Sequence, residues 1–116
     1  MFNSFYLPKN IYTNITQLAK ENHTTISNQL VICLKYAQEH QPLPRQFQNA
    51  YTEEQLPYIE TVHFIDKGTS NIFKEYLRNQ NPSLTPIQIV NLLNYGQFYQ
   101  RLEERKGLIQ NAKSTN

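Results

Sequence analysis

The sequence predicts a mostly α-helical fold with one two-stranded antiparallel β-ribbon. Two short segments alternate between apolar and polar residues, one near the start of the chain and one near its middle. Each is followed by two stretches in which apolar residues recur at the spacing of amphipathic helices. The order strand, helix, turn, helix therefore occurs twice. The 116 residues suffice for one modest core, so we expect both copies to share a single compact domain.

The first strand is expected before Pro8, which ends it because proline donates no hydrogen bond to a ladder. Successive side chains of a strand point to opposite faces. Phe5 and Leu7 therefore share the face that we expect to be buried, and Ser4 and Tyr6 share the outward face. A lone strand leaves an unpaired edge, so its partner must come from the second half of the chain or from another chain.

Two helices complete the first copy, residues 1–40. The first is expected from about residue 10 to Asn22. Its apolar positions are Ile11, Ile15, Leu18 and Ala19. Thr24-Thr25 offers an N-cap for the second helix, which continues to the end of the copy. Cys33, the one cysteine, lies in an apolar run of this helix, which favours a buried hydrophobic role over a reactive thiol.

A connector is expected over residues 41–58, because three of its residues are proline, which interrupts regular structure. A second strand follows the connector. Val62 and Phe64 share one of its faces, and Thr61 and His63 share the other. The connector is long enough to bring this strand back beside the first one.

The second copy spans residues 59–107. Thr69 or Ser70 is expected to cap its first helix. The apolar positions of that helix are Ile72, Phe73, Tyr76 and Leu77. Thr85 followed directly by proline is a strong start signal for the second helix, whose apolar face continues to about residue 106. Residues 108–116 are expected to form a flexible tail.

The two copies can be aligned with each other. In the second helices Tyr36 corresponds to Tyr95, 59 residues further on. The first helices align at a spacing of 58, and the strands align at 57, which matches Tyr6 with His63. One extra residue in each turn of the second copy accounts for the drift, and turns tolerate such insertions. The matching order of elements and the matching strand faces favour a degenerate internal repeat.

The first copy combines a strand that ends in Leu7-Pro8, a helix that ends in Leu18-Ala19-Lys20-Glu21, and a second helix that opens with Thr-Ile-Ser-Asn-Gln-Leu at residues 25–30. In this it resembles the ribbon-helix-helix superfamily of Arc/MetJ-like DNA-binding proteins, over about the first third of the chain. The resemblance implies that two copies pair their strands into an antiparallel ribbon, which enters the DNA major groove while helix N-termini bind flanking phosphates. Tandem forms occur among plasmid-transfer accessory proteins. The repeat looks like that arrangement, with two ribbon-helix-helix units in one chain forming a pseudo-dimer.

The resemblance also implies roles for individual residues. Base readout in the major groove would fall to Ser4, Tyr6, Thr61 and His63. Phosphate contacts would come from Lys9, Thr25, Ser27, Lys67 and Thr85. Family ribbons often carry Lys or Arg at the outward positions, whereas those of this chain are uncharged, which removes Arg-to-guanine readout. The formal net charge of +2 gives only weak support to nucleic-acid binding.

The expected function is that of a double-stranded DNA-binding protein, acting as a transcriptional repressor or as an accessory factor in plasmid transfer or partition. The alternative is a protein-interaction adaptor that kept the fold and lost DNA binding, which the uncharged ribbon favours. We expect no enzymatic activity, metal or cofactor, because the sequence shows no paired catalytic carboxylates, metal-ligand motif or glycine-rich phosphate loop. Lacking a membrane-spanning stretch and a signal peptide, the chain is expected to be cytoplasmic. Association of two pseudo-dimers stays open.

Overall fold

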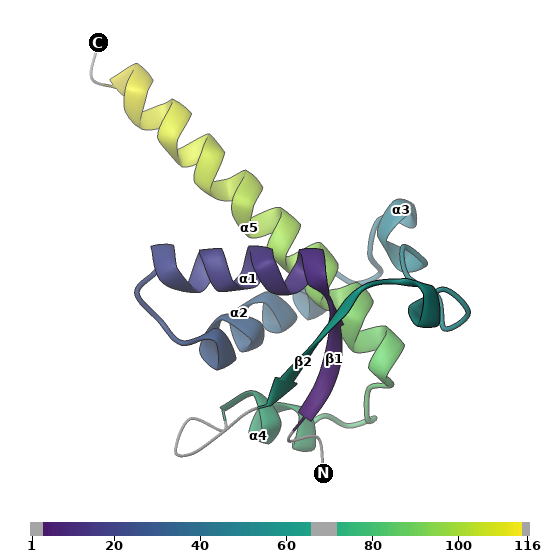
Figure 1. Ribbon diagram of the computed structural model, residues 1–116. Coiled ribbons are helices and arrows are strands. Elements are labelled where there is room, and N and C mark those ends of the chain that lie inside the picture. The colour runs from purple at the N-terminus through teal and green to yellow at the C-terminus, as the bar shows by residue number, and fades with distance from the viewer. Residues whose placement is uncertain (1–3, 66–71, 115–116) are drawn as a thin grey trace.

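The computed structural model describes the backbone of residues 4–65 and 72–114, arranged as Figure 1 shows. Side chains are described over residues 6–64 and 72–102. The elements in chain order are β1 (Ser4–Pro8), α1 (Lys9–Glu21), α2 (Ile26–Glu39), α3 (Arg45–Gln48), the 3-10 turn η1 (Leu56–Tyr58), β2 (Thr61–Ile65), α4 (Ile72–Arg78) and α5 (Pro86–Ser114). The predicted class is confirmed, because the described residues are mostly helical and include a two-stranded antiparallel sheet.

Strands β1 and β2 pair with each other within the chain. Tyr6 lies directly opposite His63. Leu7 is fully buried and Phe64 nearly so, whereas Tyr6 is 63% exposed and His63 is also exposed. The predicted alternation of inward and outward residues is therefore confirmed for these four side chains. One face of the ribbon lies on the core and the other faces solvent.

Helix α1 follows β1 without a loop, and Pro8 is its N-cap residue. The helix ends in a Schellman motif. The backbone N–H of Thr24 donates to the carbonyl of Ala19 at 2.9 Å, and the N–H of His23 donates to the carbonyl of Lys20 at 3.3 Å. His23 has a φ of 53°, the left-handed conformation that glycine usually supplies at this position. This turn reverses the chain, so that α2 packs against α1.

Helices α2 and α5 form the centre of the core, and α1 and α4 pack around them. Gly96 of α5 lies against the backbone of Cys33 in α2, where an added Cβ would lie 2.7 Å from the Cys33 carbonyl carbon. Only glycine permits this approach without a shift of the helices. The largest fully buried apolar side chains are Leu7, Ile11, Ile15, Leu18, Leu30, Leu34, Phe73 and Leu93. Residues from both halves of the chain therefore contribute to one core.

The connector is held against the first turns of α5. The backbone N–H of Tyr51 donates to Asn91 Oδ1 at 2.9 Å, and its carbonyl accepts from Asn91 Nδ2 at 3.0 Å. The Tyr51 hydroxyl accepts from Asn10 Nδ2 at 3.0 Å. Phe47 packs edge-on against the ring of Tyr95, with 5.0 Å between the ring centroids. These contacts join the connector to both α1 and α5.

Helix α5 differs from the prediction at its C-terminal end. The sequence suggested an end near residue 106 and an irregular tail, whereas the helix continues to Ser114 and its last turns extend away from the other elements (Figure 1). Glycine inside a helix costs only about 1 kcal/mol relative to alanine. Gly107 alone therefore does not end the helix, and no proline follows it. The expected capping residues Thr69 and Ser70 lie outside the described residues.

Candidate nucleic-acid interface

Two stacked rings, Tyr6 and His63, form the centre of the outward ribbon face. Their centroids are 4.7 Å apart and their planes are inclined by 19°. Leu7 and Phe64, the neighbouring residues on the inward face, are buried and hold both strands against the core. The ring pair is thus supported by the strand register. It presents aromatic faces, a phenol hydroxyl and an imidazole to solvent, groups that donate and accept hydrogen bonds without a fixed charge.

The other two residues expected to read bases lie towards the two ends of the ribbon. Thr61 pairs with Pro8 in the backbone register and is half-buried. Ser4 pairs with Ile65, and its side chain lies outside the described residues. Among the described side chains, the structure therefore brings Tyr6 and His63 together and places Thr61 two residues from the latter on the same strand.

Lys9 begins α1 next to the ribbon. Its Nζ atom lies 3.2 Å from Glu60 Oε1, and both side chains are more than half exposed. Exposed ion pairs of this kind contribute about 0–1 kcal/mol, so a DNA phosphate can compete with Glu60 for the ammonium group. Lys67, the second lysine expected to contact phosphate, lies outside the described residues.

Thr25 and Thr85 cap α2 and α5 as predicted, and both are exposed. The hydroxyl of Thr25 accepts from the N–H of Asn28 at 3.1 Å. The hydroxyl of Thr85 accepts from the N–H of Gln88 at 3.3 Å, while the Gln88 side chain accepts from the N–H of Thr85 at 2.8 Å, a reciprocal capping box. In the view of Figure 1 the ribbon lies between these two helix starts. Each start has the partial positive charge of a helix N-terminus.

Ser27 does not fit its predicted role. Its side chain is buried, at 5% exposure, and its hydroxyl accepts a hydrogen bond from the backbone N–H of Phe73 at 3.0 Å. This bond joins the first turn of α4 to α2. A hydroxyl engaged inside the protein is not placed to meet a phosphate, so the prediction that Ser27 contacts phosphate is wrong.

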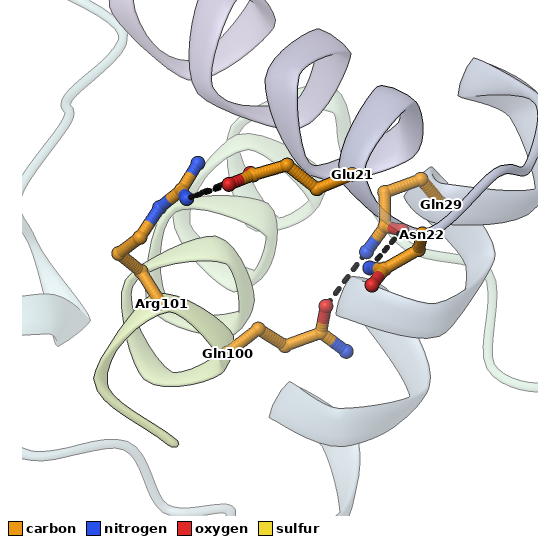
Figure 2. Close-up of polar contacts among 5 residues, drawn as sticks. All are labelled: Glu21, Asn22, Gln29, Gln100 and Arg101. Atoms are coloured by element: carbon orange, nitrogen blue, oxygen red, sulfur yellow. Dashed lines mark hydrogen bonds and ion pairs between the residues drawn. The ribbon is translucent and has the colours of Figure 1, made fainter. Parts of the chain in front are cut away.

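A polar network joins α1, α2 and α5 (Figure 2). The buried Gln29 donates from Nε2 to Gln100 Oε1 at 2.6 Å and accepts on Oε1 from Asn22 Nδ2 at 3.2 Å. Beside it, Arg101 Nη1 lies 2.7 and 3.0 Å from the two carboxylate oxygens of Glu21. The network fixes the first turns of α2 relative to α5. Sequence reasoning missed it, since a glutamine within a helix gives no sign of burial.

Cys33 is fully buried, as predicted. Burial raises the pKa of its thiol from 9.0 to about 11, so the thiol is protonated at neutral pH and is a poor nucleophile. Among the described side chains, no group of three or more His, Cys, Asp or Glu residues gathers in a way that would hold a metal ion. Within the described part of the chain, no helix combines the length and apolar character that crossing a membrane requires.

Comparison with known proteins identifies no relative: no family model, no curated protein and no solved structure matches this chain. The resemblance to the ribbon-helix-helix superfamily therefore rests on the sequence of residues 1–40.

Proposed function

We propose that this chain is a double-stranded DNA-binding protein that inserts the β1–β2 ribbon into the major groove. The main support is the outward ribbon face, on which Tyr6 and His63 lie opposite each other and exposed while the inward face is anchored in the core. The major groove is about 12 Å wide and admits a two-stranded ribbon. Within this function the protein would act as a transcriptional repressor or as an accessory factor in plasmid transfer or partition.

The proposal includes a pseudo-two-fold relation between two ribbon-helix-helix units. The repeat matches Tyr6 with His63, and the strand register puts the same two residues opposite each other at the middle of the ribbon, where a two-fold axis would pass. The same rotation would place α1 on α4 and α2 on α5. It would therefore exchange the contact between α1 and α5 with the contact between α4 and α2. The relation is approximate, because α1 has 13 residues and the described part of α4 has 7.

Backbone phosphates would be met beside the ribbon. Lys9 offers an ammonium group, and the starts of α2 and α5 at Thr25 and Thr85 offer backbone N–H groups. So few cationic contacts predict a shallow salt dependence. The slope of log K against log salt concentration should be about −2 to −5.

Fluorescence anisotropy with a random labelled duplex, titrated at several salt concentrations, tests the proposal. We expect binding at low salt with the slope given above. Tyr6→Ala should weaken binding to a duplex selected for tight binding by roughly 1–3 kcal/mol, the value of a good base contact. The melting temperature of the protein should not change. Tyr58→Ala is the matched control, because Tyr58 is 90% exposed and lies in η1 outside the ribbon. The absence of any binding at low ionic strength would overturn the proposal.

The second candidate function is that of a protein-interaction adaptor. The lack of charged residues on the ribbon favours it. Neither strand contains Asp, Glu, Lys or Arg, and Lys9 is already paired with Glu60. The exposed rings of Tyr6 and His63 would then contact another protein. The same titration separates the two functions, because an adaptor of this kind would show no affinity for duplex DNA even at low salt.

A further inference from the structure

The two ends of α5 differ in their surroundings. Its first half packs in the core, whereas its last turns extend away from the other elements (Figure 1). A short helical segment without a tertiary partner is only marginally stable in water. The sequence of residues 105–114 contains three cationic residues and no carboxylate, together with two large aliphatic residues. These residues are Arg105, Lys106 and Lys113, with Leu108 and Ile109.

An open groove of about 670 Å³ lies at the opposite end of α5, between its first turns and the connector. Apolar side chains contribute to its lining, namely Leu43, Leu84, Ile87 and Leu92. Two exposed carboxylates, Glu53 and Glu54, also border it. Neither forms an ion pair within the described part of the chain, and none of the described residues lining the groove is basic. The groove is therefore apolar and negatively charged, which complements the composition of the C-terminal segment.

Between these two regions, near the middle of α5, Phe98 is 47% exposed. It lies two helical turns after Asn91, which lines the groove, so both residues are on the same side of the helix. The ring of Phe98 packs against Phe47 of the connector, with 5.2 Å between centroids. Phe98 is not among the residues that line the groove, and its half-exposed ring offers an apolar contact point between the groove and the C-terminal segment.

We propose that α5 pairs antiparallel with α5 of a second copy of this chain. The C-terminal segment of each chain would lie in the acidic groove of the other, and the two Phe98 rings would meet near the two-fold axis. A chain cannot fill its own groove in this way. The segment lies about 20 residues further along the same helix, roughly 30 Å from the groove at about 1.5 Å per residue. Because groove and segment lie about equally far from Phe98 on either side, one two-fold rotation makes both contacts at once.

The association does not depend on DNA binding, and charge reversal tests it. Sedimentation velocity of the full chain over a range of concentrations should show a monomer–dimer equilibrium that weakens with salt. The double variants Glu53→Lys/Glu54→Lys and Arg105→Glu/Lys106→Glu should each lower the dimerisation constant roughly tenfold or more, because like charges then face each other. An equimolar mixture of the two variants should restore dimerisation, since every contact in the mixed dimer again joins opposite charges. Circular dichroism checks that both variants remain folded.

A wild-type chain that stays monomeric throughout would overturn the proposal, as would a dimer that neither variant weakens or a mixture that fails to associate. Assemblies that continue to grow with concentration would contradict the closed antiparallel pair. Phe98→Ser provides a separate check on the centre of the interface and should weaken the dimer. Tyr58→Ser, which changes an exposed tyrosine in η1, should leave it unchanged.

Discussion

Replacement of Gly96 by alanine would perturb the contact between α2 and α5 on which the shared core depends. The added Cβ would lie 2.7 Å from the carbonyl carbon of Cys33 and 2.9 Å from its Cα, and closer still to its carbonyl oxygen. Real Cβ atoms essentially never approach other atoms within 3.0 Å. All three atoms belong to the backbone of a helix, so no side-chain rotation can relieve the overlap.

Two opposing effects determine the magnitude. In an unhindered helix, replacing glycine by alanine stabilises the helix by about 1 kcal/mol. Here the helices must separate locally by roughly 1 Å or more, because the carbonyl oxygen of Cys33 is the atom closest to the added Cβ and an ordinary contact needs about 3.4 Å. The separation loosens the packing of the buried Leu34 and Leu93, which lie nearby on the same two helices. Overpacking of a core typically costs about 1–3 kcal/mol, and more where rigid backbone is involved. Because the overlap is with helix backbone, we take the upper part of that range and expect a net loss of about 1–2 kcal/mol.

Urea denaturation followed by circular dichroism gives the free energy of unfolding of both proteins. Gly107→Ala is the matched control, because it makes the same change in the part of α5 that extends beyond the other elements. That variant should be neutral or more stable by up to about 1 kcal/mol. A Gly96→Ala protein as stable as the wild type would refute the close approach of α2 and α5.

Three further perturbations have defined outcomes. The thiol of Cys33 ionises near pH 9.0 in the unfolded chain and only near pH 11 in the folded protein. The free energy of unfolding should therefore fall by up to about 3 kcal/mol between these two pH values. Urea titrations at each pH measure this fall, which should be smaller in the Cys33→Ala variant. His23→Gly should raise the free energy of unfolding by about 1 kcal/mol, because glycine adopts the left-handed conformation without steric cost. Thermal melts of both variants test this, and His23→Ala should show no such gain. Phe64→Ala should cost about 3–5 kcal/mol and His63→Ala almost nothing, and the reverse order in chemical denaturation would mean that the strand faces are inverted.

The sequence was most informative where local chemistry decides the structure. The caps at Thr25 and Thr85 were predictable, because a threonine before an apolar helical pattern satisfies free N–H groups within the same few residues. Alternation of Tyr6 and Leu7 was predictable because one face of the ribbon must be buried. The register that places Tyr6 opposite His63 agrees with the spacing at which the two strands align, although alignment alone did not decide between pairing within one chain and between two.

Features that depend on contacts between distant segments were not predictable. Ser27 lies two residues after an N-cap in the sequence. Only the packing of α4 on α2 buries its hydroxyl, which then accepts a hydrogen bond from the backbone N–H of Phe73. Gln29 is likewise buried only because α5 supplies Gln100 as its partner. The sequence predicted that α5 ends just before Gly107, and the helix is longer. One glycine costs little, and each further residue of an existing helix adds a hydrogen bond, so the helix continues past Gly107.

An intramolecular ribbon has a consequence for the kind of DNA site that the proposed function would require. In a homodimer both strands present the same residues, and a palindromic site mirrors that symmetry. Here one strand contributes Tyr6 and the other contributes His63 directly opposite it, and α1 has 13 residues whereas the described part of α4 has 7. The two halves of the ribbon therefore offer different hydrogen-bonding groups to the bases. A site contacted by one chain should accordingly be asymmetric, and inverted repeats of that site would be expected only where two chains associate through a true two-fold axis, such as the one proposed for α5.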